Sequence, residues 1–175
     1  MTVFITGGCK NGKSTFALRL AAALAPGSPH WYVATLLPKD EEGRKCVRRH
    51  RAARADMNFV TLEEPFCPTA CLDAHGESGV FLLDSVTALL TNALYEAEAP
   101  VPDPEEELAA FVRRAEHAVL VSDYIYCDGG DYNGESEAFR AKLAALDARL
   151  AGACDTVVEI VGGIPTVRKG GLPWT

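Results

Sequence analysis

A glycine-rich segment near the N-terminus carries the residue types best suited to binding a phosphate group. Residues 7–14 read Gly-Gly-Cys-Lys-Asn-Gly-Lys-Ser, which fits the pattern G-x-x-x-x-G-K-S/T. In that pattern the glycines let backbone N–H groups surround a phosphate, Lys13 reaches the β- and γ-phosphates of a nucleotide, and the Ser14 hydroxyl can ligate Mg²⁺. A glycine-rich turn that holds a Lys-Ser pair by chance is the alternative. The predicted nucleotide contacts are Gly7, Gly8, Cys9, Lys10, Asn11, Gly12, Lys13, Ser14 and Thr15.

A phosphate-binding loop of this kind needs a second acidic group to hold magnesium, usually at the end of an apolar strand. Asp84 is the candidate, because it follows the apolar run Val-Phe-Leu-Leu at residues 80–83. We therefore predict Mg²⁺ as the cofactor, with Ser14 and Asp84 as its ligands. In the alternative interpretation Asp84 caps a helix that begins near Ser85, although Ser85 could form that cap instead.

A strongly basic segment is the second feature whose residue types could take part in a reaction. Residues 44–54 hold six of the 17 lysines and arginines of the chain, together with His50. Such a segment can be a solvated surface helix. It can also be a cationic surface that attracts anionic ligands and presents His50 as a nucleophile.

The elements that must position these residues alternate between short β-branched runs and helical stretches, which is typical of α/β units around a largely parallel sheet. We predict strands at 2–6, 31–35, 58–62, 80–84, 118–122 and 155–161. We predict helices at 13–25, 40–55, 86–97, from Pro104 onward, and from about 135 to 150. The segment 65–77 is too mixed for a prediction. With the glycine-rich motif between a strand and a helix, the order predicts a three-layer α/β P-loop fold of the RecA-like type, with a mainly parallel central sheet.

The composition indicates one globular domain over residues 1–175, because the length is close to the prior of about 150 residues per domain. The net charge of −7 argues against a general nucleic-acid-binding protein. No apolar run approaches the roughly 20 residues that span a bilayer. The six cysteines form no C-x-x-C pair, and the N-terminus has no basic leader, so we expect a cytoplasmic protein with reduced thiols.

Beyond the phosphate-binding motif, the chain resembles a known family: the bifunctional adenosylcobinamide kinases/adenosylcobinamide-phosphate guanylyltransferases of cobalamin assembly. The likeness covers most of the chain, and the basic helix and the Thr-Asn pair are its more specific parts. The segments that carry it are 4–8, Tyr-Val-Ala-Thr at 32–35, Arg44 with His50 and Arg54, 60–64, 82–87 with Thr91 and Asn92, 146–151, and 157–165.

The resemblance implies two consecutive transfers to one corrinoid, adenosylcobinamide. The γ-phosphate of ATP or GTP first goes to the hydroxyl of the aminopropanol arm. A histidine, here His50, then attacks the α-phosphate of GTP, releases pyrophosphate and passes GMP to the new phosphate. The resemblance also implies a homo-oligomer, with a homotrimer as the specific expectation. The further nucleotide contacts that it implies are Thr35, Arg49, Arg51, Arg54 and Glu64.

Two segments depart from the pattern of this family. Arg49 stands beside His50, where the family often has two adjacent histidines. Residues 122–126 read Ser-Asp-Tyr-Ile-Tyr, where the family typically has Thr-Asn-Glu-Val-Gly. Asp123 could replace the missing acid or amide, or the segment could be an ordinary surface loop.

Other functions remain as alternatives at this stage. One is a kinase-only member of the family, or another small-molecule P-loop kinase that lacks guanylyl transfer. A second is a non-catalytic, nucleotide-dependent regulatory module. A signalling GTPase is disfavoured, because the chain has no Asn-Lys-x-Asp motif to read a guanine base.

Overall fold

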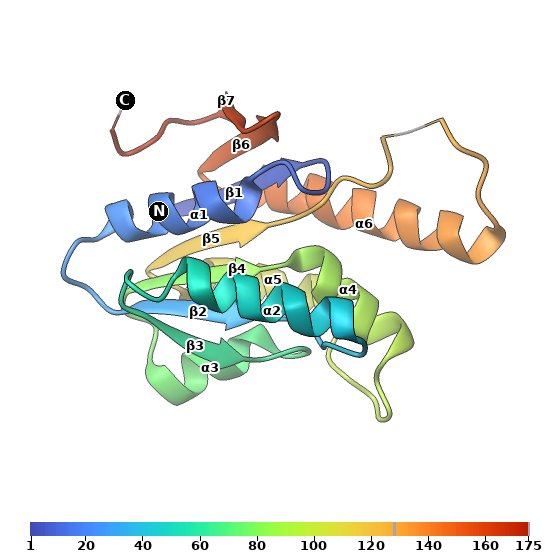
Figure 1. Ribbon diagram of the computed structural model, residues 1–175, viewed down its shortest axis with the longest axis horizontal. Coiled ribbons are helices and arrows are strands. Elements are labelled where there is room, and N and C mark those ends of the chain that lie inside the picture. The colour runs from blue at the N-terminus through green and yellow to red at the C-terminus, as the bar shows by residue number, and fades with distance from the viewer. Residues whose placement is uncertain (128, 175) are drawn as a thin grey trace.

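Six parallel strands and one antiparallel edge strand form the central sheet (Figure 1). The computed structural model describes residues 1–127 and 129–174. The order across the sheet is β3-β2-β4-β5-β1-β6-β7. The strands are β1 (Thr2–Gly7), β2 (His30–Ala34), β3 (Phe59–Glu63), β4 (Val80–Asp84), β5 (His117–Val121), β6 (Thr156–Val161) and β7 (Ile164–Lys169).

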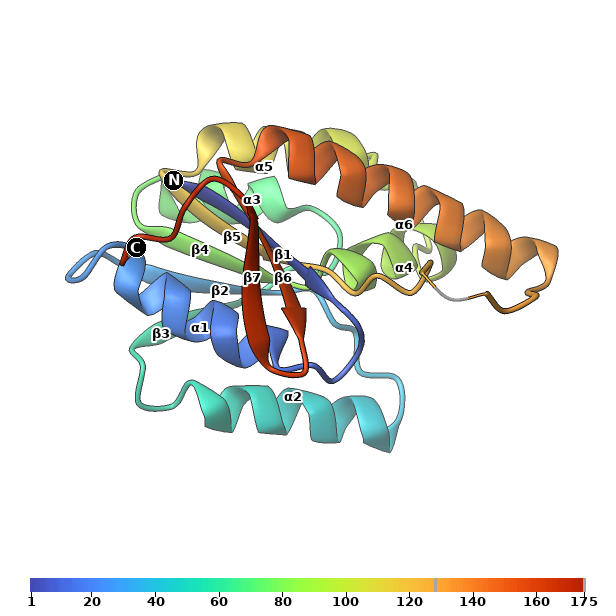
Figure 2. The same ribbon diagram turned by 90° about the horizontal axis from the view of Figure 1, so that it is seen from above.

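Helices cover both faces of this sheet, which confirms the predicted three-layer arrangement. Figure 2 shows α1 and α2 on one side and α3, α5 and α6 on the other. Each side has its own hydrophobic core, one built on α1 and the other on α3 to α6. The helices are α1 (Lys13–Leu24), α2 (Glu41–Ala53), α3 (Pro68–His75), α4 (Val86–Tyr95), α5 (Pro104–Arg114) and α6 (Gly134–Ala153).

The apolar strands of the sequence lie at the centre of the sheet. The four residues of β4 at 80–83 are all 0% exposed. A continuous apolar run without alternation is what a parallel strand covered on both faces requires. β4 lies between β2 and β5, so Asp84 at its end is held by the most buried part of the fold.

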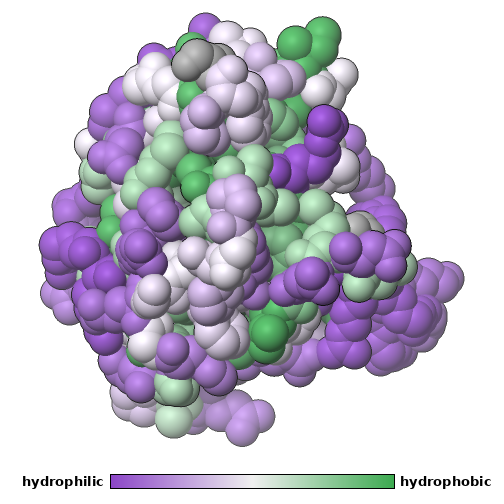
Figure 3. Space-filling model, turned by 90° about the vertical axis from the view of Figure 1, so that its left-hand side faces the viewer, coloured by the Kyte–Doolittle hydropathy of each residue, from purple (hydrophilic) through white to green (hydrophobic). Residues whose placement is uncertain are grey.

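The carboxyl ends of the parallel strands share one edge of the sheet, where ligands bind in open α/β sheets. The loop between β1 and α1, the ends of β2 and β4, and the segment after β5 all lie at this edge (Figure 1). Figure 3 shows the opposite end of the molecule, where hydrophilic side chains surround smaller apolar areas. No helix in the described part of the chain is both long and apolar enough to cross a membrane.

Two elements were not predicted from the sequence. α3 lies within the mixed segment 65–77 and begins with Pro68 in its first turn. β7 pairs with β6 through a tight turn at Gly162 and Gly163, whose φ angles are 57° and 81°. Paired glycines with positive φ are typical of two-residue hairpin turns. All residues of β7 are exposed, so no buried apolar pattern marks this strand in the sequence.

Candidate active site

The loop between β1 and α1 has the close backbone packing that its glycines permit. Gly7 has φ 153°, and a Cβ atom there would lie 2.4 Å from the carbonyl oxygen of Ile160. Gly12 has φ 86°, in the left-handed region that favours glycine. Cys9 and Lys10 at the tip of the loop are exposed to solvent. The loop is therefore fixed against β6 at its base and open at the place where a phosphate would bind.

The side chain of Lys13 is turned into the loop and is only 5% exposed. Its Nζ atom donates to the Gly8 carbonyl at 2.6 Å and to Asp123 Oδ1 at 2.5 Å. Asp123 lies two residues beyond the end of β5, and its backbone N–H donates to the Thr87 hydroxyl at 2.9 Å. Of the two interpretations of this segment, the structure favours the first, because Asp123 faces the phosphate-binding loop.

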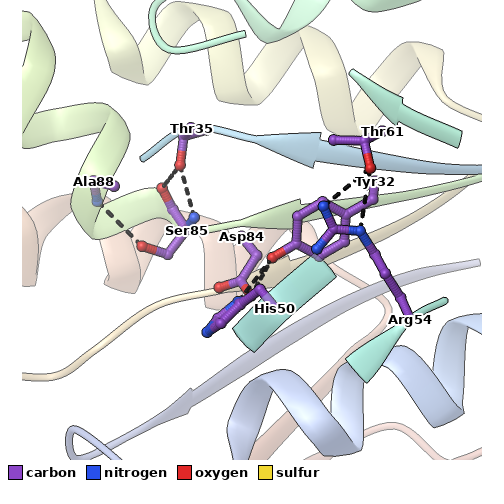
Figure 4. A network of polar contacts seen from close by, with 8 residues as sticks. All are labelled: Tyr32, Thr35, His50, Arg54, Thr61, Asp84, Ser85 and Ala88. Atoms are coloured by element: carbon purple, nitrogen blue, oxygen red, sulfur yellow. Dashed lines mark hydrogen bonds and ion pairs between the residues drawn. The ribbon is translucent and has the colours of Figure 1, made fainter. Parts of the chain in front are cut away.

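A second polar cluster forms around Asp84 at the end of β4 (Figure 4). The Tyr32 hydroxyl donates to Asp84 Oδ2 at 2.8 Å, and His50 Nδ1 lies 3.3 Å from the same oxygen and 3.1 Å from the hydroxyl. The second ring nitrogen of His50 points away from both partners (Figure 4). A carboxylate that holds one imidazole nitrogen fixes the tautomer and leaves the other nitrogen with a free lone pair. This is the arrangement that a nucleophilic histidine needs.

Hydrogen bonds keep Asp84 ionised although it is buried. Burial by itself would raise the pKa of Asp84, but contacts from His50, Tyr32 and the Ser14 hydroxyl hold this pKa below its usual range. The influence of Ser14 on this pKa indicates that the two predicted magnesium ligands lie near each other. The alternative role of Asp84 as a helix cap is wrong, because Ser85 Oγ accepts the Ala88 N–H at 3.2 Å and caps α4.

The helix α2 brings His50 to this cluster. It begins after Asp40, whose carboxylate accepts the Gly43 N–H at 2.7 Å. His50 and Arg54 are four residues apart, so they lie on the same side of the helix axis. Arg54 is 5% exposed, and its guanidinium lies 3.8 Å from the centroid of the Tyr32 ring. It also donates to the Thr61 hydroxyl at 3.0 and 3.2 Å.

The basic segment therefore divides into two faces. Arg44 and Arg48 both pair with Glu41 on the exposed side, as a solvated surface helix would. His50 and Arg54 lie on the inner side, where burial lowers the pKa of Arg54. The exposed face thus fits the solvated surface helix, and the role of the inner face in binding anions and presenting His50 as a nucleophile stays a prediction.

Four further predicted nucleotide contacts lie outside the cluster around Asp84. Thr35 is fully buried, and its hydroxyl accepts the Ser85 N–H and donates to the Ser85 carbonyl, both at 2.7 Å. Glu64 accepts the Cys67 N–H at 2.9 Å, at the start of α3. Arg51 pairs with Glu63 on the surface, and Arg49 is exposed on α2. Thr35 thus supports the segment after Asp84, and a nucleotide role for all four residues stays a prediction.

Tyr32 was missed as a site residue, although it holds both Asp84 and His50. Its position in the strand carries no signal, because tyrosine is common in strands for its packing. For Asp123 the sequence left two interpretations open, a site residue or part of a surface loop. It could not decide between them, because the partner Lys13 is 110 residues away in sequence. Both assignments depend on contacts between elements that are distant in the chain.

A buried acid lies behind the segment that carries Asp123. Asp147 on α6 is 3% exposed and accepts the Tyr126 hydroxyl at 2.8 Å. Burial raises the pKa of Asp147 to about 6, and hydrogen bonds from Ser122 and Tyr126 oppose this shift only in part. The folded chain thus keeps a proton between about pH 4 and 6 that the unfolded chain releases. The free energy of unfolding therefore has its full value below about pH 4, and part of it is lost as the pH rises through about 6, where Asp147 must ionise in its buried position.

We expect the substitution Asp147→Asn to stabilise the protein at neutral pH, because an amide needs no proton to remain neutral. The free energy of unfolding should rise by about 1–3 kcal/mol at pH 7.5, and its decrease between pH 4 and 6 should disappear. Urea denaturation at pH 4, 5, 6 and 7.5 measures this, with Asp56→Asn as a control at an exposed aspartate. A variant less stable than wild type at pH 7.5 contradicts the expectation.

Comparison with known proteins gives consistent matches. A family model described as cobinamide kinase / cobinamide phosphate guanyltransferase matches residues 3–167. The chain is 32% identical over 173 residues to the bifunctional adenosylcobalamin biosynthesis protein CobP of Pseudomonas aeruginosa (strain PAO1). This match covers 97% of this chain and 98% of that protein.

Two solved structures share the fold. The flagellar accessory protein FlaH from Methanocaldococcus jannaschii matches with a TM-score of 0.55 and 14% identity, over 97% of this chain and 78% of FlaH. A prototypical ATPase from the type III secretion system of pathogenic bacteria matches with a TM-score of 0.50 and 13% identity. That match covers 95% of this chain and 56% of the ATPase. At such identities the likeness shows the fold alone, and it confirms the predicted P-loop α/β class.

Proposed function

The chain belongs to the cobinamide kinase / cobinamide phosphate guanyltransferase family, and from this premise we propose that it catalyses both transfers on adenosylcobinamide. The first transfer makes adenosylcobinamide phosphate from a nucleoside triphosphate, ATP or GTP. The second attaches GMP from GTP and gives adenosylcobinamide-GDP. The observation that carries the proposal is that His50 Nδ1 of α2 lies 3.3 Å from Asp84 Oδ2, at the edge of the sheet that also carries the phosphate-binding loop.

In the first transfer, the hydroxyl oxygen of the acceptor attacks the γ-phosphorus, and the bond to the bridging oxygen of the β-phosphate breaks. The nucleoside diphosphate leaves. The backbone N–H groups of residues 8–13 and the Lys13 ammonium stabilise the charge on the transferred group. Asp123, next to Lys13, is the carboxylate placed to accept the hydroxyl proton.

In the second transfer, the Nε2 atom of His50 attacks the α-phosphorus of GTP, and pyrophosphate leaves with the bridging oxygen. The phosphate oxygen of the acceptor then attacks the same phosphorus, the N–P bond breaks, and His50 is free again. Asp84 and the Tyr32 hydroxyl hold Nδ1 throughout, so the ring stays oriented and the charge on the guanylylated imidazole is balanced.

The residues around Asp84 also fit a magnesium ion. Ser14 and Asp84 offer a hydroxyl and a carboxylate oxygen, the hard ligands that Mg²⁺ prefers. Within the described residues no group of three or more His, Cys, Asp or Glu side chains could hold a metal. That suits Mg²⁺, which usually keeps water and takes further ligands from substrate phosphates. When bound, it would neutralise charge on the β- and γ-phosphates.

The proposal predicts two sequential products from the purified protein. Adenosylcobinamide with ATP or GTP should give the phosphate, and GTP should then give adenosylcobinamide-GDP with one pyrophosphate per turnover. Liquid chromatography of the corrinoid products with detection by mass spectrometry measures both steps. Formation of the phosphate alone would point to a kinase-only member, and nucleotide binding without either product would point to a regulatory module. A homo-oligomeric state and a cytoplasmic location stay predictions.

A further inference from the structure

A cavity of about 780 Å³ lies beside the phosphate-binding loop, on the side of the sheet covered by α4 and α6. Cys9 of the loop forms one wall, Tyr95 at the end of α4 another, and Tyr124 after β5 a third. Phe139 and Arg140 of α6 also line it. Figure 1 shows α4 and the first half of α6 extending beyond the carboxyl ends of the strands, on the side of the loop. The cavity is separate from the cluster of His50 and Asp84, which faces α2.

The walls of this cavity are unusually aromatic for a surface open to water. Tyr95 is 53% exposed and Tyr132 is 47% exposed. The Tyr95 and Phe139 rings lie 6.0 Å apart, and the Arg140 guanidinium lies 4.1 Å from the Tyr132 ring. Rings that remain half exposed around a hollow mark a binding site for an apolar ligand. A few polar groups among them, Arg140 included, can fix the orientation of that ligand.

The position of the cavity places its ligand next to the phosphates. Tyr124 lines the cavity and follows Asp123, which binds Lys13. The Tyr124 N–H also donates to the Gly7 carbonyl at 3.2 Å, so this wall is attached to the phosphate-binding loop itself. A ligand in the cavity thus has direct access to the place where Lys13 holds a γ-phosphate.

We propose that this cavity is the acceptor site and holds the corrin ring of cobinamide against Tyr95, Tyr132 and Phe139. The inference rests on the proposed function and adds where and how the acceptor binds. A corrin is a broad, largely apolar macrocycle with amide arms, so its face suits aromatic side chains and its arms suit the polar groups of the rim. Its aminopropanol arm then extends along Tyr124 toward Asp123 and Lys13.

The test compares wild type with Tyr95→Ala and Tyr132→Ala, two truncations at half-exposed positions. We expect the dissociation constant and the KM for cobinamide to rise about tenfold in each, because each loses one aromatic contact. The KM for the nucleotide should stay within about twofold. Tyr95→Phe, which keeps the ring, should restore cobinamide binding. Val60→Ala, at a 52% exposed position on β3, serves as the control.

The outcomes separate this inference from the proposed function. Unchanged cobinamide binding in both alanine variants overturns the acceptor site, whether or not the wild type has kinase activity. If the wild type binds cobinamide through Tyr95 and Tyr132 but transfers no phosphate, the acceptor site stands and the proposed kinase activity fails. If the wild type binds no cobinamide at all, both fail. Titration followed by the visible absorbance of the corrinoid gives the binding constants independently of turnover.

Discussion

A His50→Ala variant is expected to take up no label from GTP radiolabelled at the α-phosphate, whereas the wild type becomes labelled. The label on the wild type should be stable in alkali and released by acid, as expected for a phosphoramidate on histidine. The reason is geometric: Nδ1 is held by Asp84 and Tyr32, which leaves Nε2 as the nucleophile. Denaturing gel electrophoresis followed by autoradiography measures the label.

Two further variants sharpen this test. Tyr32→Phe keeps the ring beneath Arg54 but removes the hydroxyl that contacts Asp84 and His50, so labelling should slow by about tenfold. Substitution of His75, which lies on α3 against the Trp31 ring, should leave labelling unchanged. Equal labelling of wild type and His50→Ala would exclude His50 as the nucleophile.

A Lys13→Ala variant is expected to lose phosphorylation of cobinamide by about 10²–10³ in kcat, the usual cost of removing one group that stabilises transition-state charge. The Lys13 ammonium is buried inside the phosphate-binding loop, 2.6 Å from the Gly8 carbonyl, whereas Lys10 at the tip is exposed. The fold should survive, because its partner Asp123 is 28% exposed and can be hydrated once the ammonium is gone. Initial rates at saturating nucleotide and cobinamide measure the loss.

Lys142→Ala is the matched control for this variant, because it removes the same ammonium from an exposed position on α6. Circular dichroism and thermal melting check that Lys13→Ala remains folded. Turnover of Lys13→Ala equal to that of wild type would contradict the assignment of residues 7–14 as the phosphate-binding loop of a kinase.

The sequence was sufficient to predict the parts of the site that belong to single segments. Residues 7–14 form a local motif, and Asp84 follows a run of buried residues that only a central strand explains. The three-layer architecture follows from the alternation of such runs with helices. These features depend on neighbours within the chain, so a pattern can reveal them.

Contacts across the fold could not be predicted in the same way. The pairing of Tyr32 with Asp84, and of Asp123 with Lys13, depends on the order of strands in the sheet. The exposed strand β7 has no buried face to produce an apolar pattern. The aromatic cavity assembles from Cys9, α4, and the segment after β5 together with the helix α6 that follows it, three parts of the chain that are distant from one another in sequence.

The proposed use of Asp84 in both transfers, as a magnesium ligand and as the partner of His50, has an evolutionary consequence. Two activities that use one carboxylate cannot be inherited or lost independently at that position. A lineage can discard guanylyl transfer by changing His50 and still keep a kinase. In the proposed mechanism a change at Asp84 would end both reactions at once, so purifying selection on either activity would preserve a residue of the other.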